Sequence, residues 1–421
     1  MISKTPKIFF QKIKNIFWHL PKSFFYNIYF GQPSKKLILI GVTGTDGKTT
    51  TVNLIHQTLL QCGIKAGAIS TLGAKIGDRN ISVGLHTTSP DPKKVNQIFQ
   101  AMIEEGITHV VVEVTAHALD QFRFFGCYFQ VSVLTNTSHE HLDDFYDLNR
   151  YIATKAKLFS QSNITILNKD DPSYNSISKL SLQNVKTYGT HPKNDYLATN
   201  IKLTKSKLIF KINNLPVSTN SNYLYQVHNI LATFGVIDSL GLPIAALIEI
   251  IKDFPAMKGR RENIPNDYKI NCLVDFAHTP AALKSTLETI KQITSGKCIV
   301  IFGATGGRDP SKRPLMGQVV SETADIAIIT ADDTRNEKVE DINRQIISGI
   351  GQPKNKKFIY YDIPNRQDAF NLAVKLAAKG DTIIACGKGH ETTILHGHTE
   401  YPWSEAEAFR TALRYRFANN A

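Results

Sequence analysis

The sequence contains no apolar run long enough for a membrane-spanning helix, which needs about 18 apolar residues in succession. Cysteine is also scarce. The chain has five cysteines, an odd number that lie far apart, and no two of them form a Cys-x-x-Cys pair. This spacing argues against a disulfide framework and against a zinc site, and it fits a protein of the reducing cytoplasm.

Acidic residues are absent from residues 1–36, an N-terminal arm that carries seven lysines and nine aromatic residues. Seven of the 13 net positive charges therefore lie in this arm. Apolar residues recur at roughly helical spacing between Ile8 and Leu20, and Pro21 is expected to end this helix. Lysines interrupt the apolar stretch, so a signal peptide is not expected. The arm could lie in a membrane interface, or it could pack on the body of the protein or in a dimer contact.

The rest of the composition is that of a globular protein. With 421 residues, the chain is long enough for two or three domains. Hydrophobic residues make up 42% of the chain and charged residues 20%, which excludes a disordered composition. The net charge of +13 suggests an anionic partner. We do not expect that partner to be nucleic acid, because the sequence has no recognisable nucleic-acid-binding motif.

Short apolar strands alternate with helical patterns from residue 37 onward. In the first half, strands are predicted at 37–42, 108–114, 129–136 and 165–171, and helices at 49–62, 93–105, 147–160 and 228–240. In the second half, strands are predicted at 271–278, 297–304, 325–333, 357–362 and 381–387, with helices starting at Pro280 and Arg313 and at 339–350 and 366–378. Residues 185–225 are predicted to form a small set of antiparallel strands that leaves the main sheet.

Strands that alternate with helices form parallel βαβ units and doubly wound sheets. The sequence therefore predicts an α/β protein in which the arm at 1–36 precedes two domains. The first, at 37–258, is a P-loop ATPase-type domain with a mainly parallel sheet. The second, at 259–421, is a Rossmann-like, doubly wound domain.

A glycine-rich and threonine-rich loop, GVTGTDGKTT at 41–50, follows the first strand and opens a helix. In this context backbone N–H groups cradle phosphates. A lysine at 48 suits the β- and γ-phosphates, and the Thr49 hydroxyl can bind Mg²⁺. The predicted nucleotide-binding residues of the loop are Gly44, Thr45, Gly47, Lys48, Thr49 and Thr50. The loop departs from the general P-loop spacing, and by itself it does not distinguish a kinase from a GTPase or a ligase.

Nine further motifs resemble the Mur ligases, the ATP-dependent amide-forming enzymes of peptidoglycan precursor synthesis, and they occur in that family's order. They are HTTSPDP (86–92), EVTAHALDQFR (113–123), TNTSHEHLD (135–143), YIATKAKLF (151–159), GRRE (259–262), VDFAHTPAAL (274–283), GGRDPSKRPLMG (306–317), DDTR (332–335) and GKGHE (387–391). Two of them are similar to the members that add a third residue to UDP-N-acetylmuramoyl-L-alanyl-D-glutamate. The resemblance covers about residues 37–410.

The resemblance implies a reaction in which ATP phosphorylates a carboxylate and an amine displaces phosphate from the acyl phosphate. Catalysis of phosphoryl transfer rests mainly on positioning and electrostatic stabilisation. The implied catalytic residues are Lys48, Glu113, His141, Lys155 and His278. The implied Mg²⁺ ligands are Thr49, Glu113, His141 and Lys155, the last as a carbamate formed on its side chain. Glu113 also follows an apolar strand, where a carboxylate reaches the edge of the sheet.

Other residues are implied to hold the substrates. Thr87, Thr88, Thr115, Gln121 and Arg123 match positions that hold the muramoyl dipeptide, whose sugar and carboxylate groups suit hydroxyl and guanidinium partners. Asn229 and Arg260 are expected to contact the nucleotide from the central domain. Asp275 and His278 would complete the ATP site from the next domain when the domains close. Arg308, Asp332, Asp333, Arg335, Gly387 and Glu391 are expected to meet the incoming amino acid.

The motif DDTR bears on which amino acid is added, because the diaminopimelate-adding enzymes carry DNPR at this place. Arg335 is retained and would bind the distal carboxylate of diaminopimelate, which lysine lacks. The additional carboxylate of Asp333 would instead favour lysine, whose distal end is an ammonium group. On balance the sequence favours diaminopimelate.

Enzymes of this kind begin with a small domain that holds the UDP group, whereas here the arm stands before the phosphate loop. We therefore expect the UDP group to be held differently, held weakly or absent, and a lipid-linked acceptor at a membrane is a second candidate substrate. A related ligase of the folylpolyglutamate or cyanophycin type and a non-catalytic ATP-binding module are competing hypotheses. We expect a monomer or weak homo-oligomer in the cytoplasm, and membrane association through the arm stays open.

Overall fold

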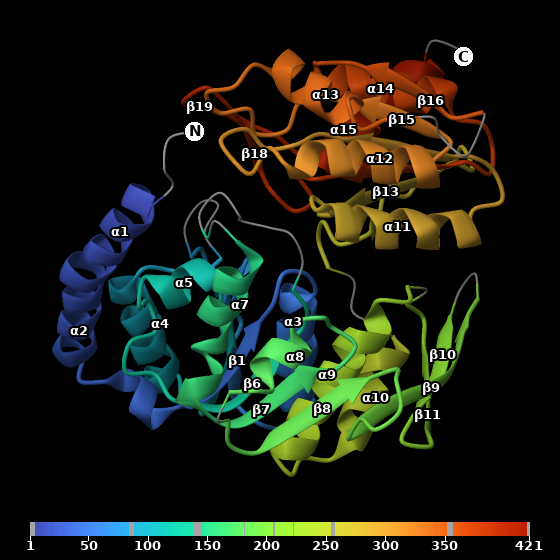
Figure 1. Cartoon of the computed structure of the whole chain (residues 1–421). Helices are drawn as coiled ribbons and strands as arrows, with labels where there is room; N and C mark the ends of the chain where they lie inside the picture. Colours follow the sequence, from blue (N-terminus) through green and yellow to red (C-terminus); the bar gives the residue numbers. More distant parts are fainter. Residues whose placement is uncertain are drawn as a thin grey trace. The chain divides into compact units, whose positions relative to one another are not determined.

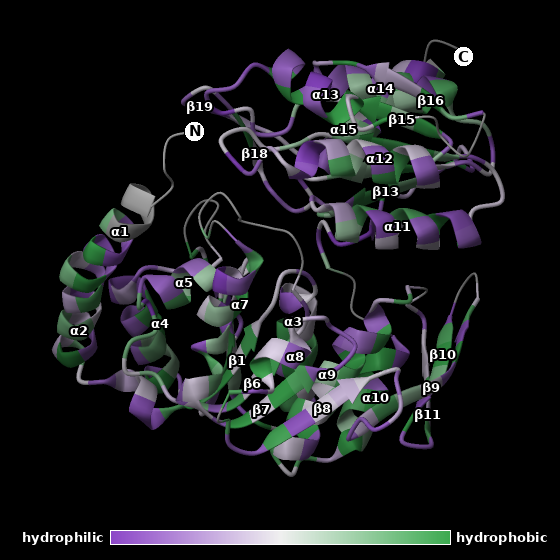
Figure 2. Ribbon diagram, viewed as in Figure 1, coloured by the Kyte–Doolittle hydropathy of each residue, from purple (hydrophilic) through white to green (hydrophobic). Residues whose placement is uncertain are grey.

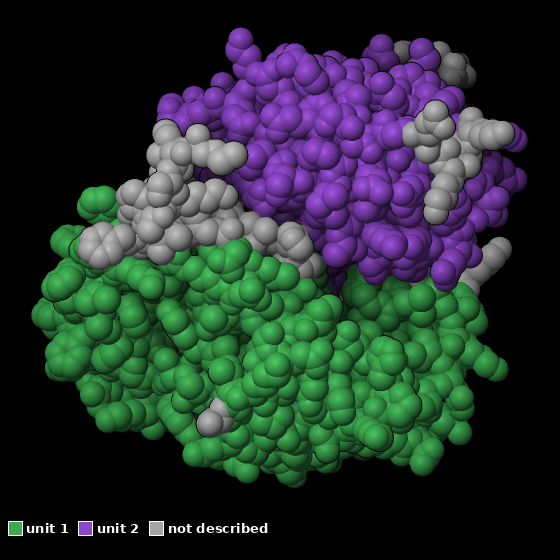
Figure 3. Space-filling model, viewed as in Figure 1, with its two compact units in different colours: residues 1–138, 144–255 green, residues 139–143, 256–421 purple. Residues whose placement is uncertain are grey.

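The chain folds into two compact units (Figure 1), and the computed structural model describes residues 5–83, 88–137, 145, 147–180, 182–204, 207–221, 223–253, 257–351 and 357–418. The first unit comprises residues 1–138 and 144–255, and the second comprises residues 139–143 and 256–421 (Figure 3). In the described part of the chain, no helix has the length and apolar character needed to cross a membrane.

A single sheet forms the centre of the first unit. Its strand order is β11-β10-β9-β8-β7-β6-β1-β5-β2-β3-β4, and β1 pairs in parallel with both β5 and β6. The strands are β1 (Ile38–Thr43), β2 (Ala66–Ser70), β3 (Gly73–Ile76), β4 (Arg79–Ile81), β5 (His109–Glu113), β6 (Phe129–Leu134), β7 (Ser162–Asn168), β8 (Val185–Gly189), β9 (Tyr196–Leu203), β10 (Leu208–Ile212) and β11 (Leu215–Thr219).

Helices cover both faces of this sheet. On one face lie α3 (Lys48–Gln61), α9 (Gln226–Ser239) and α10 (Ile244–Lys252), whose apolar residues share one core with the strands. On the other face lie α4 (Pro92–Glu104), α5 (Ala116–Asp120), α7 (Leu148–Ala156) and α8 (Tyr174–Ile177), with the short helix η3 (Phe159–Gln161). Since both faces are covered, the central strands are apolar along their whole length, and Figure 2 shows hydrophobic residues concentrated along them.

The second unit repeats this arrangement on a smaller sheet. Its strand order is β12-β13-β17-β14-β15-β16, and every pair except β12 with β13 is parallel. The strands are β12 (Glu262–Asn263), β13 (Asn271–Asp275), β14 (Cys298–Phe302), β15 (Ile326–Ile329), β16 (Ile359–Asp362) and β17 (Thr382–Cys386). One face is covered by α14 (Arg366–Leu376) and α15 (Glu405–Ala418), and the other by α11 (Pro280–Ile293), α12 (Lys312–Thr323) and α13 (Val339–Ile347). A hairpin of β18 (Thr393–His396) and β19 (Thr399–Pro402) follows β17. The predicted α/β class, with a mainly parallel sheet and then a doubly wound one, is confirmed.

The prediction for residues 185–225 is only partly right. β8 and β9 do not leave the sheet but extend it in parallel, and only β9, β10 and β11 pair antiparallel to one another. The alternation of polar and apolar residues in this segment reflects strands at the margin of the sheet, where one face is less covered. The β2–β4 meander, α10, α15 and the β18–β19 hairpin are elements that the sequence patterns did not indicate.

The N-terminal arm is helical for longer than predicted. It consists of α1 (Thr5–Lys14), a π-helical turn η1 (Asn15–His19), α2 (Leu20–Tyr29) and a short helix η2 (Pro33–Lys36). The prediction that Pro21 ends the helix is wrong. Pro21 lies directly after the π-helical turn of a continuous helix, and π-helical turns and prolines both occur where the regular hydrogen-bond ladder of a helix is interrupted.

A buried histidine lies between the phosphate-loop helix and the sheet. His56 of α3 is 4% exposed, and its Nε2 atom lies 3.2 Å from the carbonyl oxygen of Ala66 in β2. Because the carbonyl accepts this hydrogen bond, Nε2 carries the hydrogen. Burial, together with the nearby charge of Lys75, lowers the pKa of His56 to about 4. His56 is therefore neutral in the folded protein at neutral pH.

This histidine should make the folded state sensitive to acid. Between pH 6.5 and 4 the unfolded chain binds a proton at His56 that the folded protein does not bind, so the free energy of unfolding falls as the pH falls. The contribution between pH 7 and pH 5 is about 2 kcal/mol. His56→Gln retains a donor for Ala66, and its loss of stability over this range should be smaller by about that amount in denaturant titrations. His398→Gln, at an exposed position, should behave like the wild type. Equal acid sensitivity of His56→Gln and the wild type would contradict the prediction.

Candidate active site

The loop between β1 and α3 has a backbone that only glycine fits at two positions. Gly44 and Gly47 have φ angles of 149° and 81°. A Cβ atom on Gly44 would lie 1.8 Å from Oγ1 of Thr135, and one on Gly47 would lie 2.4 Å from Oδ1 of Asn229. Both glycines therefore provide close approach as well as a backbone conformation that other residues rarely adopt.

Side chains from three elements hold the peptide groups of this loop. Three consecutive carbonyl oxygens each accept a hydrogen bond from a side chain. Nζ of Lys155 in α7 donates to the carbonyl of Gly44 at 2.6 Å, and Nζ of Lys48 in α3 donates to the carbonyl of Thr45 at 2.6 Å. The carbonyl of Asp46 accepts from two residues that follow β6, Oγ1 of Thr135 at 2.7 Å and Nδ2 of Asn136 at 3.0 Å. Asn136 also accepts from the amides of Thr45 and Asp46, at 2.8 and 2.9 Å. The loop is thus fixed by its own lysine and also by side chains that lie far from it in the sequence, at separations of 89 to 111 residues.

The loop leads directly into the N-terminus of α3. The first helical residues, Lys48, Thr49 and Thr50, follow Gly47 as the N-cap, and no side chain caps this end. The amides of a helix's first turn have no intrahelical acceptor, and together with the helix dipole they favour an anion. The half-buried Lys48 adds a positive charge at the same place. This combination is suited to binding the phosphates of a nucleotide.

A buried carboxylate lies beside this helix end. Glu113, the last residue of β5, is 2% exposed. Its Oε2 atom accepts hydrogen bonds from Oγ1 of Thr49 at 3.0 Å and from the amide of Thr71 at 3.1 Å, and its Oε1 atom accepts from Oγ1 of Thr71 at 3.1 Å. Thr49 and Glu113 are adjacent hard oxygen donors at a phosphate-binding helix end, which fits the preference of Mg²⁺ for oxygen ligands. Thr71 is a contact that the sequence motifs did not indicate.

Lys155 is buried, contrary to what is usual for a lysine on a helix. It is 1% exposed, its Nζ atom donates to the carbonyl of Gly44, and the same atom lies 4.2 Å from the centroid of the Tyr151 ring. The hydroxyl of Tyr151 lies 3.3 Å from Oγ1 of Thr45. The neighbouring Lys157 instead forms an ion pair with Asp120 at 3.6 Å. Of the two lysines, Lys155 is the one that reaches the phosphate loop.

Asn229 reaches the loop from the opposite side. It is 4% exposed in α9, and its Oδ1 atom lies 3.4 Å from Oγ1 of Thr51 as well as close to Gly47. Its Nδ2 atom donates to Gln226 at 2.8 Å. Asn229 therefore belongs to the same cluster as the loop, and its contact with a nucleotide stays a prediction.

Two of the five residues predicted to hold the dipeptide, Thr115 and Arg123, contact a single serine. Ser89 is 1% exposed, and its hydroxyl donates to the carbonyl of Glu113 at 3.0 Å and lies 3.2 Å from Oγ1 of Thr115. Its own carbonyl accepts a short hydrogen bond from Arg123, and Arg123 also donates twice to Gln121. Oγ1 of Thr88 lies 3.1 Å from Oγ1 of Thr71, which itself contacts Glu113. Burial lowers the pKa of the Arg123 guanidinium.

Thr87 and His141 lie outside the described residues. Ser89 belongs to the motif at 86–92, but no feature of the sequence distinguishes it from its neighbours there. Among the described residues, no group of three or more histidine, cysteine, aspartate or glutamate side chains is arranged to hold a metal ion. Of the predicted Mg²⁺ ligands, Thr49 and Glu113 are described and lie next to each other.

Three further predicted residues lie at the start of the second unit. Arg260 belongs to this unit and not to the first, so the prediction that it contacts the nucleotide from the central domain is wrong in that respect. Its guanidinium carbon lies 4.5 Å from the centroid of the Phe276 ring. Asp275 accepts hydrogen bonds from the amides of Arg261 and Ala277, both at 2.9 Å. Nδ1 of His278 lies 2.8 Å from the carbonyl of Phe276.

A lysine at the centre of the second unit's polar cluster was not predicted. Lys388 is fully buried, and its Nζ atom lies 2.6 Å from Oδ1 of Asp333 and forms a second, shorter ion pair with Glu391. Burial alone would raise the pKa of Asp332, but the positive charges of Lys388 and Arg366 hold that pKa below its usual range. The carboxylate of Asp332 is therefore charged in the folded protein, and Lys388 is the largest contributor of the positive charge that stabilises it.

The remaining predicted residues lie on the three loops that follow β14, β15 and β17. Gly306 donates its amide to the carbonyl of Asp333 at 2.7 Å, and a Cβ atom on Gly387 would lie 2.6 Å from Oδ2 of Asp332. Arg335 follows with a φ of 51° and bridges to His396 of β18. Arg308 is half-buried in the turn that contains Gly306. The structure thus gathers all six residues predicted to meet the amino acid on adjoining loops of one unit.

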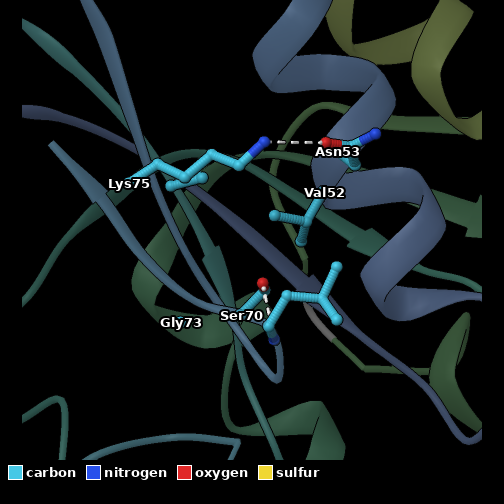
Figure 4. A pocket seen from close by; sticks show the side chains of 7 residues that line it. Val52, Asn53, Ser70, Gly73 and Lys75 are labelled. Carbon is cyan, nitrogen blue, oxygen red and sulfur yellow. Dashed lines mark hydrogen bonds between the residues drawn. The ribbon is translucent and has the colours of Figure 1, made fainter. Parts of the chain in front are cut away.

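A small hollow beside α3 does not contribute to this site. It is lined by residues of α3 and the β2–β3 hairpin, among them Val52, Asn53, Ser70, Gly73 and Lys75 (Figure 4). Nζ of Lys75 donates to Asn53 at 3.4 Å across it. It has room for about one water molecule, which excludes a substrate of any size.

Comparison with known proteins identifies the family. The family model described as the Mur ligase middle domain matches residues 42–237, and the one described as the Mur ligase, glutamate ligase domain matches residues 259–389. The chain belongs to the Mur ligase family. The resemblance indicated by the sequence motifs is therefore confirmed.

Curated proteins similar to this Mur ligase share most of its length. A UDP-N-acetylmuramoyl-L-alanyl-D-glutamate--2,6-diaminopimelate ligase of Geobacillus kaustophilus is 33% identical over 401 residues, which cover 92% of this chain and 81% of that protein. A ligase of the same name from Caldanaerobacter subterraneus subsp. tengcongensis is 36% identical over 390 residues, covering 91% and 80%.

Solved structures agree in fold. A structure of a UDP-N-acetylmuramoyl-L-alanyl-D-glutamate--2,6-diaminopimelate ligase aligns with a TM-score of 0.62 at 27% identity and covers 90% of this chain and 79% of that one. The folylpolyglutamate synthase of Mycobacterium tuberculosis aligns with a TM-score of 0.71 over 94% and 95% of the two chains, but at 14% identity. The second likeness concerns the fold alone.

The close contact at Gly44 generates a prediction about nucleotide binding. Gly44→Ala would place a methyl group against Thr135 and shift the loop, so ATP binding measured by calorimetry should weaken at least tenfold. Gly77→Ala is a matched control, because Gly77 also has a positive φ, 56°, but nothing lies within 4 Å of its Cβ position. The control should lose some thermal stability and keep its ATP affinity. Unchanged ATP binding by Gly44→Ala would show that the loop does not hold the nucleotide.

Proposed function

We propose that this Mur ligase is an ATP-dependent acid–amino-acid ligase that adds meso-diaminopimelate to UDP-N-acetylmuramoyl-L-alanyl-D-glutamate in peptidoglycan precursor synthesis. The observation that carries the proposal is the phosphate loop with Lys48, Thr49 and Glu113 gathered at one helix end. It occurs in a chain that is 31–36% identical to ligases named for this reaction.

The reaction needs two successive displacements. An oxygen of the D-glutamyl carboxylate attacks the γ-phosphorus of ATP, ADP leaves, and the carboxyl group becomes an acyl phosphate. The amine then attacks the carbonyl carbon, the bond from that carbon to the phosphate oxygen breaks, and inorganic phosphate leaves. In this proposal the α3 N-terminus and Lys48 bind and orient the phosphates and stabilise the charge on the transferring group.

Thr49 and Glu113 are proposed to hold a Mg²⁺ ion, since both present hard oxygen atoms at the helix end. When bound, such an ion neutralises the charge of the phosphates and helps to fix their position. His141 is proposed as a further ligand, and His278 as a catalytic residue, on the motifs alone. Thr87, Thr88, Thr115, Gln121 and Arg123 are proposed to bind the dipeptide, and the link from Thr88 through Thr71 to Glu113 supports this.

We also propose that Lys155 carries a carbamate. The neutral amine would attack CO₂, forming an N–C bond and releasing one proton, which gives an anionic N-carboxylate. The position supports this, because Nζ is almost completely buried and donates to the carbonyl of Gly44, so a carboxylate formed on it would lie beside the phosphate loop. The carbamate nitrogen keeps one hydrogen, so the bond to the carbonyl of Gly44 can persist while the carboxylate serves as an additional oxygen ligand for Mg²⁺.

For the incoming amino acid, we propose that Arg335 binds the distal carboxylate of diaminopimelate. Arginine matches a carboxylate in a two-point geometry. Asp333, which the sequence suggested would act against this preference, lies against Lys388, and its Oδ1 atom also accepts from the amide of Leu395 at 2.9 Å. Its Oδ1 atom is thereby held by Lys388 and the backbone of the protein, so we propose that it does not counter Arg335.

We place the reaction in the cytoplasm, where ATP and nucleotide-linked precursors occur, and expect a monomer or a weak homo-oligomer. Contact of the N-terminal arm with a membrane is proposed as well, because the arm combines lysines with exposed aromatic residues.

Phosphate release tests the proposed function. With ATP, Mg²⁺ and UDP-N-acetylmuramoyl-L-alanyl-D-glutamate, release should depend on an added diamino acid and should be largest with meso-diaminopimelate among a panel that includes lysine. Lys48→Ala should abolish release. Lys155→Ala should abolish it too, with partial rescue by added short carboxylates, whereas Lys157→Ala should remain active. Absence of amine-dependent release with every member of the panel would reject the proposal.

The specificity proposal makes its own prediction. Arg335→Asn should raise the KM for meso-diaminopimelate at least tenfold, the expected cost of losing a charged hydrogen bond. Asparagine is chosen because it tolerates the positive φ of this position. Asp333→Asn keeps the acceptor for Leu395 and should leave the preference for meso-diaminopimelate over lysine unchanged. A switch toward lysine or away from it in Asp333→Asn would show that Asp333 acts on the substrate directly.

A further inference from the structure

The N-terminal arm packs on the first unit through its polar side. Every fourth residue from 11 to 27 is polar, and together these residues form the polar stripe: Gln11, Asn15, His19, Ser23 and Asn27. Asn15, Ser23 and Asn27 are 4%, 2% and 3% exposed. Nδ2 of Asn15 donates to Asp120 at 2.6 Å, and Nδ2 of Asn27 donates to the carbonyl of Phe125 at 2.7 Å. Figure 1 shows α2 running beside α4, and the two helices are in contact.

The π-helical turn keeps this stripe facing the unit. A spacing of four residues exceeds the 3.6 residues of an α-helical turn, so the stripe would drift around the helix. The wider turn at Asn15–His19 takes back part of this drift. As a result, residues from Gln11 to Asn27 can contact the same surface along both α1 and α2.

The opposite side of the arm is apolar and exposed. This arm face comprises seven large side chains that are each more than half exposed: Phe10 68%, Ile16 51%, Phe17 75%, Trp18 66%, Phe25 57%, Ile28 51% and Tyr29 69%. Phe24, 52% exposed, lies at its border, where its ring packs edge-on against Phe125 of the first unit. A surface helix of a globular protein normally turns such residues inward and its polar residues outward. Here the order is reversed, and contiguous exposed apolar surface of this kind marks an interaction site.

Positive charge accompanies the arm face. Lys12, Lys14, Lys22, Lys35 and Lys36 are all exposed, and residues 1–36 contain no acidic residue. Aromatic and aliphatic side chains flanked by lysines are typical of helices that lie in the plane of a membrane interface. Pairing of two copies through this face would bring lysines of the same sign together with no acidic partner in the arm, which disfavours self-association.

We propose that the arm face docks on the surface of a membrane containing anionic lipids. The aromatic side chains would enter the boundary between headgroups and acyl chains, the lysines would contact lipid phosphates, and the polar stripe would stay on the protein. This inference does not depend on the ligase activity, because it rests on residues that take no part in the proposed reaction.

Vesicle co-sedimentation of the full chain tests the proposal. The probes are vesicles of phosphatidylcholine alone and of phosphatidylcholine with about one-third phosphatidylglycerol. The wild type should pellet with the anionic vesicles, much less with the neutral ones, and less at high salt, because exposed charges are screened. The double variant Phe17→Ser, Trp18→Ser should bind at least tenfold more weakly. The triple variant Lys12→Gln, Lys14→Gln, Lys22→Gln should lose most of the preference for anionic vesicles.

Matched controls distinguish binding through the arm face from non-specific vesicle binding by other exposed aromatic residues and lysines. Tyr415→Ser removes an aromatic residue that is 67% exposed in α15, and Lys202→Gln, Lys207→Gln, Lys211→Gln removes three exposed lysines from β9–β10 and the turn between them. Both should bind vesicles like the wild type, and all variants should retain the wild-type circular dichroism spectrum. Equal pelleting of the wild type and the Phe17→Ser, Trp18→Ser variant would overturn the proposal. So would a wild-type dimer, broken by that variant, with no vesicle binding.

Discussion

The candidate site of the first unit depends on the fixed backbone path from Gly44 to Gly47. Lys155, Lys48, Thr135 and Asn136 bind the peptide groups of this path from three elements of the unit. Since the path is fixed, α3 begins at a defined place, with its first amides and the positive end of its dipole directed to one point. A site arranged in this way before the substrate arrives spends little free energy on reorganisation, which is how electrostatic stabilisation is most effective.

Two buried charged side chains, Glu113 in the first unit and Lys388 in the second, follow the same rule, since each is hydrogen-bonded or ion-paired. Glu113 accepts from Thr49 and Thr71, and Lys388 lies against Asp333 and Glu391. Such groups are costly to bury unless they are satisfied, and once satisfied they are held rigidly. The arm is built in the reverse way. It uses its polar stripe for attachment to the unit and leaves its aromatic residues exposed, which is unfavourable in water and favourable at a lipid surface.

Much of the fold could be predicted from the sequence because its signals are local. The apolar run before GVTGTDGKTT, the loop and the following helix lie within 25 residues of one another, and parallel strands buried on both faces appear as apolar runs. Three kinds of feature could not be predicted. A proline such as Pro21 usually marks the end of a helix. The π-helical turn that lets the helix continue here has no recognisable sequence signal. Ser89, Thr71 and Lys388 act through contacts with residues distant in sequence. The burial of Lys155 follows from packing against the loop, whereas a helical lysine on its own predicts a solvated charge.

In the proposed reaction, the phosphate loop delivers the γ-phosphoryl group of ATP to a substrate carboxylate before the amine attacks. Oxygen-isotope transfer from the carboxylate to phosphate distinguishes this order of steps from the alternatives. With UDP-N-acetylmuramoyl-L-alanyl-D-glutamate labelled with ¹⁸O in the reacting carboxylate, we expect one labelled oxygen in each inorganic phosphate released, measured by mass spectrometry. Release of phosphate without label, or appearance of the label in AMP, would contradict the claim.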